Sequence, residues 1–383
     1  MEACDERSGL RASALVVSQR SIPYRSVLMR RLIAVFACVV GLLLPGAARG
    51  QASGAPLLYV ANQGEATVSI IDMQSLEIVD RVDLKALGFS KNAKPHHVVA
   101  EADGSAWYLT LIGANTVLKF NAQNELVKRL DMEVPGLLAI DTTSTRLYAG
   151  RSMSAVNPPQ SLAVIDRAAM RVEMANTFFP RPHPIAVSPD GRYVYNASLA
   201  MNQMLAMDAS STKIELKTLG GKTQTFVDFA VTPDGTTMVG TGQVTGEVLL
   251  FDMSNAPAIT VTDTLQVGAQ PWHPVISPDG RYAYIPNKAS HSVSIIDLQA
   301  REVVDTITGN GLAQPHGTVL SADGRYLFVS NNNRKGTYTP TGNNSTAGTI
   351  TVIDTQSREI VEVIEVGTYP SGIGTWGGQV AAQ

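Results

Sequence analysis

The chain has 383 residues and a formal net charge of -3, which allows a large core but gives no reason to expect nucleic acid or an anionic membrane surface as a partner. Its two cysteines, Cys4 and Cys38, both lie near the start. If that region is removed, the mature chain has no thiol. This excludes a disulfide framework, a Cys-x-x-Cys-His haem attachment and a thiolate-bound metal.

The first 50 residues are organised like a secretory leader. Arg30 and Arg31 precede an apolar run over residues 32–44, and small residues follow it up to Gly50. This order is typical of a signal peptide, and the run is short for a membrane span. We therefore expect a leader over residues 1–50, a single domain over residues 51–383, a periplasmic or secreted location, and no membrane span in the mature chain.

From residue 57 onward the sequence repeats one unit. In the copy from Pro182 to Asp208, two short apolar alternations flank Asp190-Gly191, a tight-turn signal, and a third apolar run ends in Asp208. The period is roughly 42–49 residues for all units but the last, the length of a four-stranded propeller blade. The third run ends at Asp72, Asn121, Asp166, Asp208, Asp252, Asp297 and Asp354.

The repeats predict an all-β fold, a seven-bladed β-propeller with four-stranded blades. For the fourth blade we expect strands over about residues 185–188, 192–197, 203–208 and 213–218. The first blade has only three strand patterns, whereas residues 366–374 read like the start of another repeat. We expect this C-terminal segment to complete the first blade and close the ring, which removes the open edges.

The segments Tyr59-Val60-Ala61-Asn62 and Ser188-Pro189-Asp190-Gly191-Arg192-Tyr193-Val194-Tyr195 resemble the YVTN-repeat seven-bladed propellers. The likeness covers nearly the whole mature chain. It implies the architecture but no single activity, because related propellers occur in nitrous oxide reductase, in cytochrome cd1 nitrite reductase and in lactonases.

Strand order assigns all the histidines to one end of the ring. The Asp-Gly turns lie at the opposite end, where their carboxylates are best interpreted as turn-formers. His96, His183 and His316 stand seven positions before their Asp-Gly turn, and His97 and His273 stand six before; Trp272 takes the seventh-position place in the sixth blade.

Such a ring of imidazoles is suited to holding a transition metal or to acid–base chemistry. The alternative is that Pro-His simply starts the inner strand. His96 and His97 face the axis together only if that start is irregular.

The resemblance offers two cofactor hypotheses. A copper site would use His96, His183 and His316, as a partial version of the nitrous oxide reductase propeller; a haem-like cofactor would follow cytochrome cd1. A lactonase would use Lys94, Arg181 or Arg334 to receive a carboxylate or phosphate. Further candidates on this face are Trp272, His291 and Asn331.

The last blade carries a polar, Gly-rich insertion over residues 331–348, which we expect to be mobile or a lid over the channel. The favoured function is an exported binding platform for a small ligand, a metal or a partner protein at the histidine face. A copper or haem-type oxidoreductase or maturation factor is the first alternative, and a lactone hydrolase is the second. The sequence decides neither enzymatic activity nor oligomeric state.

Overall fold

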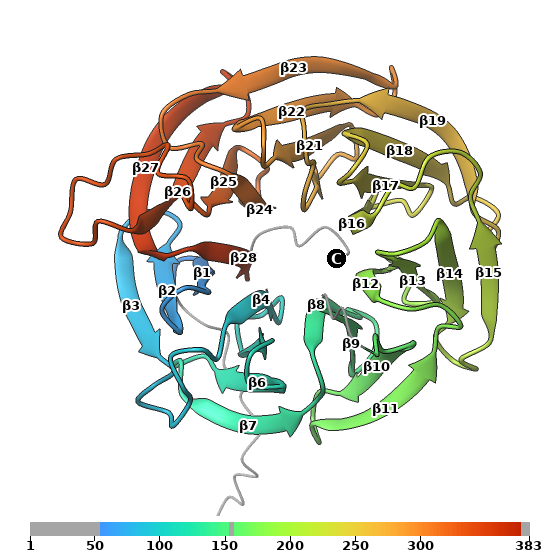
Figure 1. Cartoon of the computed structure of the whole chain (residues 1–383), viewed down its shortest axis with the longest axis horizontal. Coiled ribbons are helices and arrows are strands. Elements are labelled where there is room, and N and C mark those ends of the chain that lie inside the picture. Colours follow the sequence, from blue (N-terminus) through green and yellow to red (C-terminus); the bar gives the residue numbers. More distant parts are fainter. Residues whose placement is uncertain (1–53, 153–156, 377–383) are drawn as a thin grey trace, which may run out of the picture. The chain divides into compact units, whose positions relative to one another are not determined.

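The computed structural model describes residues 54–152 and 157–376, and every regular element within these ranges is a β-strand. The strands form seven antiparallel sheets of four strands each, arranged as a ring (Figure 1). The predicted seven-bladed propeller is therefore confirmed. The proposed leader and signal peptide lie outside the described residues.

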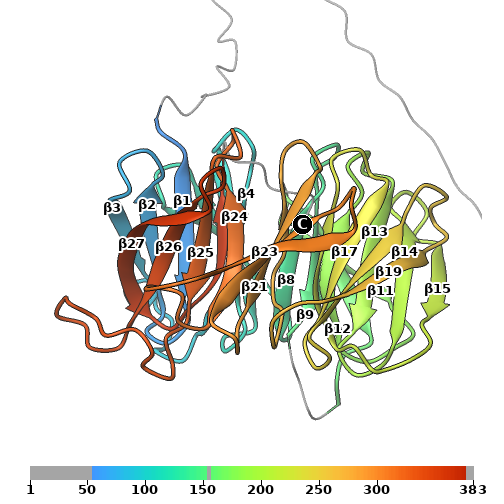
Figure 2. The ribbon, with the colours of Figure 1, turned by 90° about the horizontal axis from the view of Figure 1, so that it is seen from above.

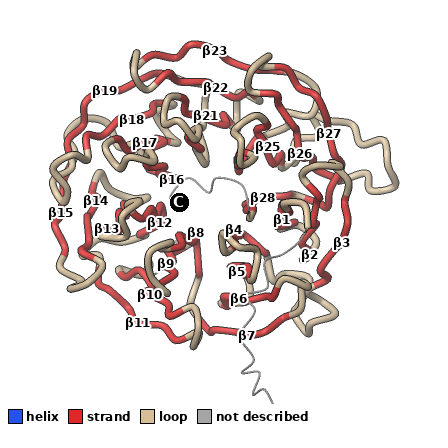
Figure 3. Tube along the Cα trace, turned by 180° about the vertical axis from the view of Figure 1, so that it is seen from behind, coloured by secondary structure: helices blue, strands red, loops and turns tan. Residues whose placement is uncertain are grey.

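Each blade has an inner, a second, a third and an outer strand, which run through the thickness of the ring (Figure 2). The inner strands surround the axis (Figure 3) and are β28 (Pro370–Thr375), β4 (Pro95–Ala100), β8 (Pro135–Ile140), β12 (Pro182–Val187), β16 (Phe226–Val231), β20 (Val275–Ile276) and β24 (Pro315–Leu320). The second strands are β1 (Leu57–Asn62), β5 (Ala106–Leu111), β9 (Arg146–Arg151), β13 (Tyr193–Ser198), β17 (Thr237–Gly242), β21 (Tyr282–Asn287) and β25 (Tyr326–Asn331).

The third strands are β2 (Thr67–Asp72), β6 (Thr116–Asn121), β10 (Ser161–Asp166), β14 (Gln203–Asp208), β18 (Glu247–Asp252), β22 (Ser292–Asp297) and β26 (Ala347–Asp354). All seven end at the residue predicted from the repeat. The outer strands are β3 (Ile78–Asp83), β7 (Leu126–Asp131), β11 (Arg171–Asn176), β15 (Ile214–Thr218), β19 (Thr260–Gln266), β23 (Glu302–Thr308) and β27 (Glu359–Thr368).

The Asp-Gly turns join the inner and second strands at the end of the ring opposite the histidines. In the fourth blade the Asp190 carboxylate accepts hydrogen bonds from the Ser188 hydroxyl at 2.6 Å and from the Arg192 backbone N–H at 3.0 Å, while Gly191 has a φ of 70°. A left-handed glycine is what such a turn needs. These carboxylates therefore shape turns, as the sequence indicated.

The ring is closed by the C-terminal strand. β28 pairs antiparallel with β1, with Leu58 opposite Thr375 and Val60 opposite Ile373. The Ser371 hydroxyl also donates to the carbonyl oxygen of His96 in the second blade, at 3.1 Å. The prediction that the end of the chain completes the first blade is confirmed.

The hydrophobic core consists of seven clusters, one at each interface between neighbouring blades. Between the first and second blades, Tyr59 stacks on Trp107 with ring centroids 4.8 Å apart, and Trp107 stacks on Phe120 at 3.9 Å. Because each blade buries its two faces against its two neighbours, the stability of the ring depends on every interface being present.

Six inner strands directly follow a left-handed residue that is not glycine, and in the sixth blade such a residue precedes the bridge residue Pro271, ahead of β20; φ lies between 39° and 63° in all seven. These residues are Lys94, Val134, Arg181, Thr225, Gln270, Gln314 and Tyr369. In the second blade the register with β5 then shifts between Pro95 and Val98. The inner strands consequently start earlier than predicted, at Pro182 and not Ile185 in the fourth blade, and their first residues do not alternate like a regular strand.

The insertion in the seventh blade is not a lid over the channel. Glu365 on the outer strand β27 accepts hydrogen bonds from the Tyr338 hydroxyl at 2.9 Å and the Gly342 N–H at 2.9 Å. These contacts hold the loop between β25 and β26 at the rim, where it projects beyond β27 (Figure 1). The expectation of a lid is therefore wrong, because the Glu365 carboxylate anchors the loop at the rim; mobility of the loop stays a prediction.

Within the part of the chain that the structure describes, there is no helix with the length and apolar character needed to cross a membrane.

Candidate functional site

Five imidazoles gather at the channel mouth. The ring centroid of His96 lies 6.3 Å from that of His183 and 6.3 Å from that of His316. The His273 ring is 4.8 Å from His316 and 5.9 Å from His97. The structure thus brings together the five predicted histidines from four blades, and we call them the histidine cluster: His96, His97, His183, His273 and His316.

The irregular start of the inner strands explains how consecutive residues join one cluster. His96 and His97 follow the left-handed Lys94 and lie within the register shift between Pro95 and Val98. Both of their rings consequently contact other cluster members, His96 beside His183 and His97 beside His273. For His96 and His97 to face the axis together, the inner strand needs an irregular start, as expected from the sequence, and β4 has such a start.

A close backbone approach positions His183. A Cβ atom on Gly150, in β9 of the third blade, would collide with the carbonyl oxygen of His183 in the fourth. Only glycine leaves room for these two backbones to come so close. The neighbouring Arg151 supplies the carbonyl oxygen that lies 2.7 Å from His183 Nδ1.

Hydrogen bonds at Nδ1 determine which nitrogen carries the proton in two rings. His183 Nδ1 must donate, because its partner is the Arg151 carbonyl oxygen, and its Nε2 therefore holds a lone pair. His97 is the opposite case: its Nδ1 accepts the Leu138 backbone N–H at 3.2 Å, so its Nε2 is a donor. The neutral cluster therefore presents both acceptors and donors.

Four nitrogens of the cluster are buried without a hydrogen-bond partner among the described residues. They are Nδ1 and Nε2 of His96, Nε2 of His273 and Nδ1 of His316. His273 and His316 expose only 2% and 3% of their surface. Leaving buried polar atoms unpaired costs about 1–3 kcal/mol each, so these nitrogens require a partner that the described residues do not supply.

Burial keeps the cluster neutral near pH 7. It lowers the pKa of His183 to about 4 and that of His273 to about 3, and it holds the pKa values of His96, His97 and His316 well below the usual range of histidine. Repulsion between the imidazoles, and from Lys288, acts in the same direction on His96 and His316. The rings are therefore available as lone-pair donors and hydrogen-bond donors, and not as cations.

Asp228 was missed in the sequence. Its Oδ2 lies 2.6 Å from His273 Nδ1, and only 2% of the residue is exposed. Burial raises the pKa of Asp228 to about 8. The pair therefore shares one proton and orients the His273 ring with Nε2 turned away from the carboxyl group. Asp228 stands six positions before Asp234-Gly235, the same offset as His97 and His273, so the repeat alignment would have found it.

Lys288 was also missed, because it follows β21 without any motif. Its ammonium lies over the Trp272 ring, 4.1 Å from the centroid, and Trp272 in turn lies 5.2 Å from His316. Burial and the nearby charge of Arg334 lower the pKa of Lys288 to about 8. Arg334 itself lies over the ring of Tyr369, at 4.7 Å. Lys288 therefore acts directly on His96 and His316, and Arg334 lies close enough to Lys288 to repel its charge.

The remaining predicted residues lie on the same face but outside the cluster. Lys94 is exposed and Arg181 half-buried, and each precedes an inner strand with φ above 50°. His291 Nδ1 accepts the Gln314 N–H at 3.0 Å. Asn331 is fully buried, and its Nδ2 donates to the Val329 carbonyl oxygen and to the Thr351 hydroxyl. Asn331 and His291 thus have structural bonds of their own.

The predicted metal ligands His96, His183 and His316 are chemically suited to copper or zinc, since imidazole is a common ligand of both. As the side chains stand, however, no group of three or more His, Cys, Asp or Glu residues in the described ranges is arranged to hold a metal ion. His96 has both other rings as neighbours at 6.3 Å. A metal would therefore require these rings to turn.

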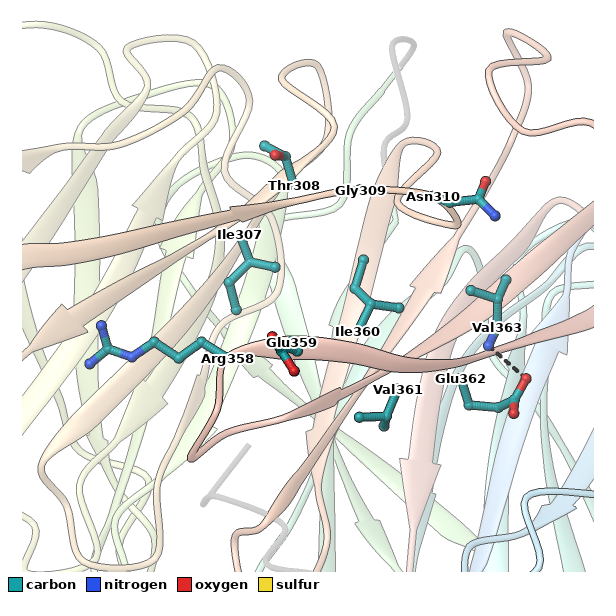
Figure 4. A pocket seen from close by; sticks show the side chains of 10 residues that line it. All are labelled: Ile307, Thr308, Gly309, Asn310, Arg358, Glu359, Ile360, Val361, Glu362 and Val363. Carbon is teal, nitrogen blue, oxygen red and sulfur yellow. Dashed lines mark hydrogen bonds between the residues drawn. The ribbon is translucent and has the colours of Figure 1, made fainter.

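A groove of about 720 Å³ lies on the outer rim, between the end of β23 and β27 (Figure 4). Ile307, Ile360 and Val363 line it together with the charged Arg358 and Glu359. It contains no histidine and lies at the outer edges of two blades. It offers no group of convergent polar atoms comparable to the histidine cluster.

Solved structures with the same fold cover most of the chain. A functionally unknown protein from Desulfotomaculum acetoxidans DSM 771 is similar with a TM-score of 0.68 and 15% identity, over 84% of this chain and 99% of that one. Kuenenia stuttgartiensis hydrazine synthase has a TM-score of 0.61 and 17% identity, over 78% and 92%. At these identities the likeness shows the fold alone.

A third similar structure is the dihydro-heme d1 dehydrogenase NirN in complex with DHE, with a TM-score of 0.59 and 16% identity, over 86% of this chain and 77% of that one. No curated protein matches the sequence. The YNCE-like beta-propeller family model matches residues 168–381, more than half of the chain. This match agrees with the repeats and the seven-bladed ring, and the chain belongs to the YNCE-like beta-propeller family.

Proposed function

We propose that this protein is an exported binding propeller that takes a small ligand at the histidine cluster. The observation that carries the proposal is the set of four buried imidazole nitrogens without a partner. Water molecules satisfy them when the site is empty, and a ligand with matching donors and acceptors replaces that water. Export rests on the leader pattern in residues 1–50.

The proposal is tested by native mass spectrometry of protein purified from its own host. We expect a mass above that of the mature chain, and its loss in a His96→Asn/His316→Asn variant that still melts cooperatively. His291→Asn is the matched control, because it removes a histidine of the same face that lies outside the cluster. A parent protein with only the bare mass, which also acquires nothing from a small-molecule extract of the host, contradicts the proposal.

A transition metal is the second candidate, favoured by the orientation of two rings. His183 is fixed by the Arg151 carbonyl oxygen and His273 by Asp228, the kind of support that metal-ligating histidines receive. Bound copper would supply redox chemistry, and His96 and His316 would complete its ligands. Elemental analysis of host-purified protein tests this: stoichiometric metal that is lost in the His96→Asn/His316→Asn variant supports it, and a metal-free parent opposes it.

A haem-like cofactor is tested by recording the absorption spectrum of the same host-purified protein. The similar NirN structure is a complex with DHE, and this is the reason for recording the spectrum. A lactone hydrolase would use the Asp228–His273 pair as a general base acting on water after the shared proton has left, that is, above about pH 8. Lactone hydrolysis that disappears in a folded His273→Gln variant would support that activity. A partner protein on this face would appear in the mass spectrum as a mass of protein size.

A further inference from the structure

We propose that the ligand of the histidine cluster is a small anion, bearing a carboxylate, phosphate or sulfate group that lies against Lys288. This inference rests on the proposed function and names the ligand class of the same site. It follows from the charges around the cluster and from the hydrogen-bond donors that the neutral imidazoles provide.

The Lys288 ammonium has no carboxylate partner. In the described ranges no ion pair or hydrogen bond of Lys288 Nζ is present, although the side chain is half-buried and nine ion pairs form elsewhere on the propeller. The Trp272 ring stabilises the positive charge at 4.1 Å but accepts no conventional hydrogen bond from it. The three N–H donors of the ammonium remain for water or a ligand.

A second cation acts on the same region. The guanidinium of Arg334 stacks on Tyr369, the residue directly before β28, and forms no ion pair in the described part of the chain. Its charge adds to burial in lowering the pKa of Lys288, which means that the two positive groups are close enough to repel each other. An anion between them would relieve that repulsion.

Among the residues that the structure describes, the carboxylate in contact with the cluster is not free to neutralise these cations. Asp228 is paired with His273 at 2.6 Å and shares a single proton with it. The same arrangement disfavours a bare metal cation, because the dication would approach two uncompensated positive charges. His97 Nε2, a donor by its tautomer, and the unfixed rings of His96 and His316 can donate to an anionic oxygen.

The contacts form one continuous path from the cation to the cluster. Lys288 lies over Trp272, Trp272 is 5.2 Å from His316, and His316 is 6.3 Å from His96. A ligand that contacts Lys288 with its anionic group therefore lies within reach of the unpartnered nitrogens with the rest of its body.

The experiment is calorimetric titration of the mature protein with acetate, benzoate, phosphate and sulfate at constant ionic strength, with neutral benzamide as the uncharged match for benzoate. We expect at least one anion to bind saturably, benzoate to bind more tightly than benzamide, and the Kd of the bound anion to rise about tenfold or more in Lys288→Gln. Lys288→Arg should retain binding. Lys217→Gln on β15 removes the same charge at the rim and should leave the Kd unchanged.

The anion inference is overturned if no anion binds the parent, or if Lys288→Gln binds it as tightly as the parent does. A melting curve for each variant separates loss of binding from loss of folding, and Arg334→Gln provides an independent second variant. The proposed function is judged separately. A host ligand that is lost from His96→Asn/His316→Asn but retained by Lys288→Gln keeps the histidine site and rejects the anion.

Discussion

Removal of everything after Thr368 should abolish cooperative folding. This truncation deletes β28, so β1 loses the partner that faces Leu58 and Val60, and the interfaces on both sides lose the buried Ile373 and Trp376. The inner ring would then have a gap between β24 and β4. The expected loss is at least about 5 kcal/mol, as large as the whole stability of many domains.

Urea unfolding followed by far-ultraviolet circular dichroism measures this effect. A chain that lacks only residues 380–383 keeps β28 complete and is the matched control. If the chain that ends at Thr368 unfolds at the parent's urea midpoint and with the same steepness, ring closure contributes little to stability.

Acid should unfold the protein through the histidine cluster. His96, His97, His183 and His316 are neutral in the folded state because burial lowers their pKa values, whereas in the unfolded chain they take up protons below about pH 6.5. Since the unfolded state binds more protons, stability falls as pH falls. Each group contributes about 1.4 kcal/mol per pH unit, so the slope between pH 6 and 5 should approach about 5 kcal/mol per unit.

The Asp228–His273 pair does not add to this slope. Folded, it holds one proton over that range; unfolded, Asp228 is ionised and His273 is protonated, which is again one proton. Above pH 6.5 the unfolded pair loses its proton first, because the pKa of folded Asp228 is raised to about 8. The pair should therefore lower the stability by roughly 1 kcal/mol between pH 7 and 8, and Lys288, whose pKa is lowered to about 8 in the folded state, offsets part of that decline.

Urea midpoints taken across pH 5 to 8 test both parts of this curve. The His96→Asn/His316→Asn variant removes two of the four groups and should halve the acid slope. An acid slope that is the same in the variant and the parent would show that these imidazoles are protonated, or exposed, in the folded state.

Most of the fold could be predicted from the sequence repeat. Two alternating apolar segments joined by an Asp-Gly turn pair as a hairpin. The third strands end at the predicted residues because the terminal residue shapes the next turn, as Asp208 does by accepting the Ser210 N–H at 3.0 Å. The closing strand was predictable because a propeller with one incomplete blade leaves open edges.

The geometry of the inner-strand start was not predictable. Left-handed residues are usually glycine or asparagine, whereas here Lys94, Arg181 and Gln314 adopt that conformation under the constraint of the ring. Six of the seven left-handed residues precede a proline, but a proline favours an extended conformation for the residue before it, so this feature does not indicate the left-handed one. Their effect, which places both His96 and His97 in the cluster, appears only in three dimensions.

The candidate site was predicted in part. The histidines share an offset from the Asp-Gly turns, so their grouping followed from repeat alignment, and the same rule applied to Asp228 would have identified it. Lys288 depends on packing within the sixth blade: it reaches the cluster by lying over Trp272, a contact that no spacing rule encodes. The rim position of the insertion likewise depends on Glu365, which is distant in sequence.

The central claim is that the imidazoles of the histidine cluster contact a ligand, and histidine-selective ¹⁵N nuclear magnetic resonance tests it directly. At pH 7 the ligand-free protein should show neutral rings, with His183 protonated at Nδ1 and His97 at Nε2. Adding the small-molecule extract of the host should shift the signals of His96, His273 and His316 and leave His291 unchanged. Cluster signals that do not respond, or that report charged imidazoles at pH 7, would contradict the account.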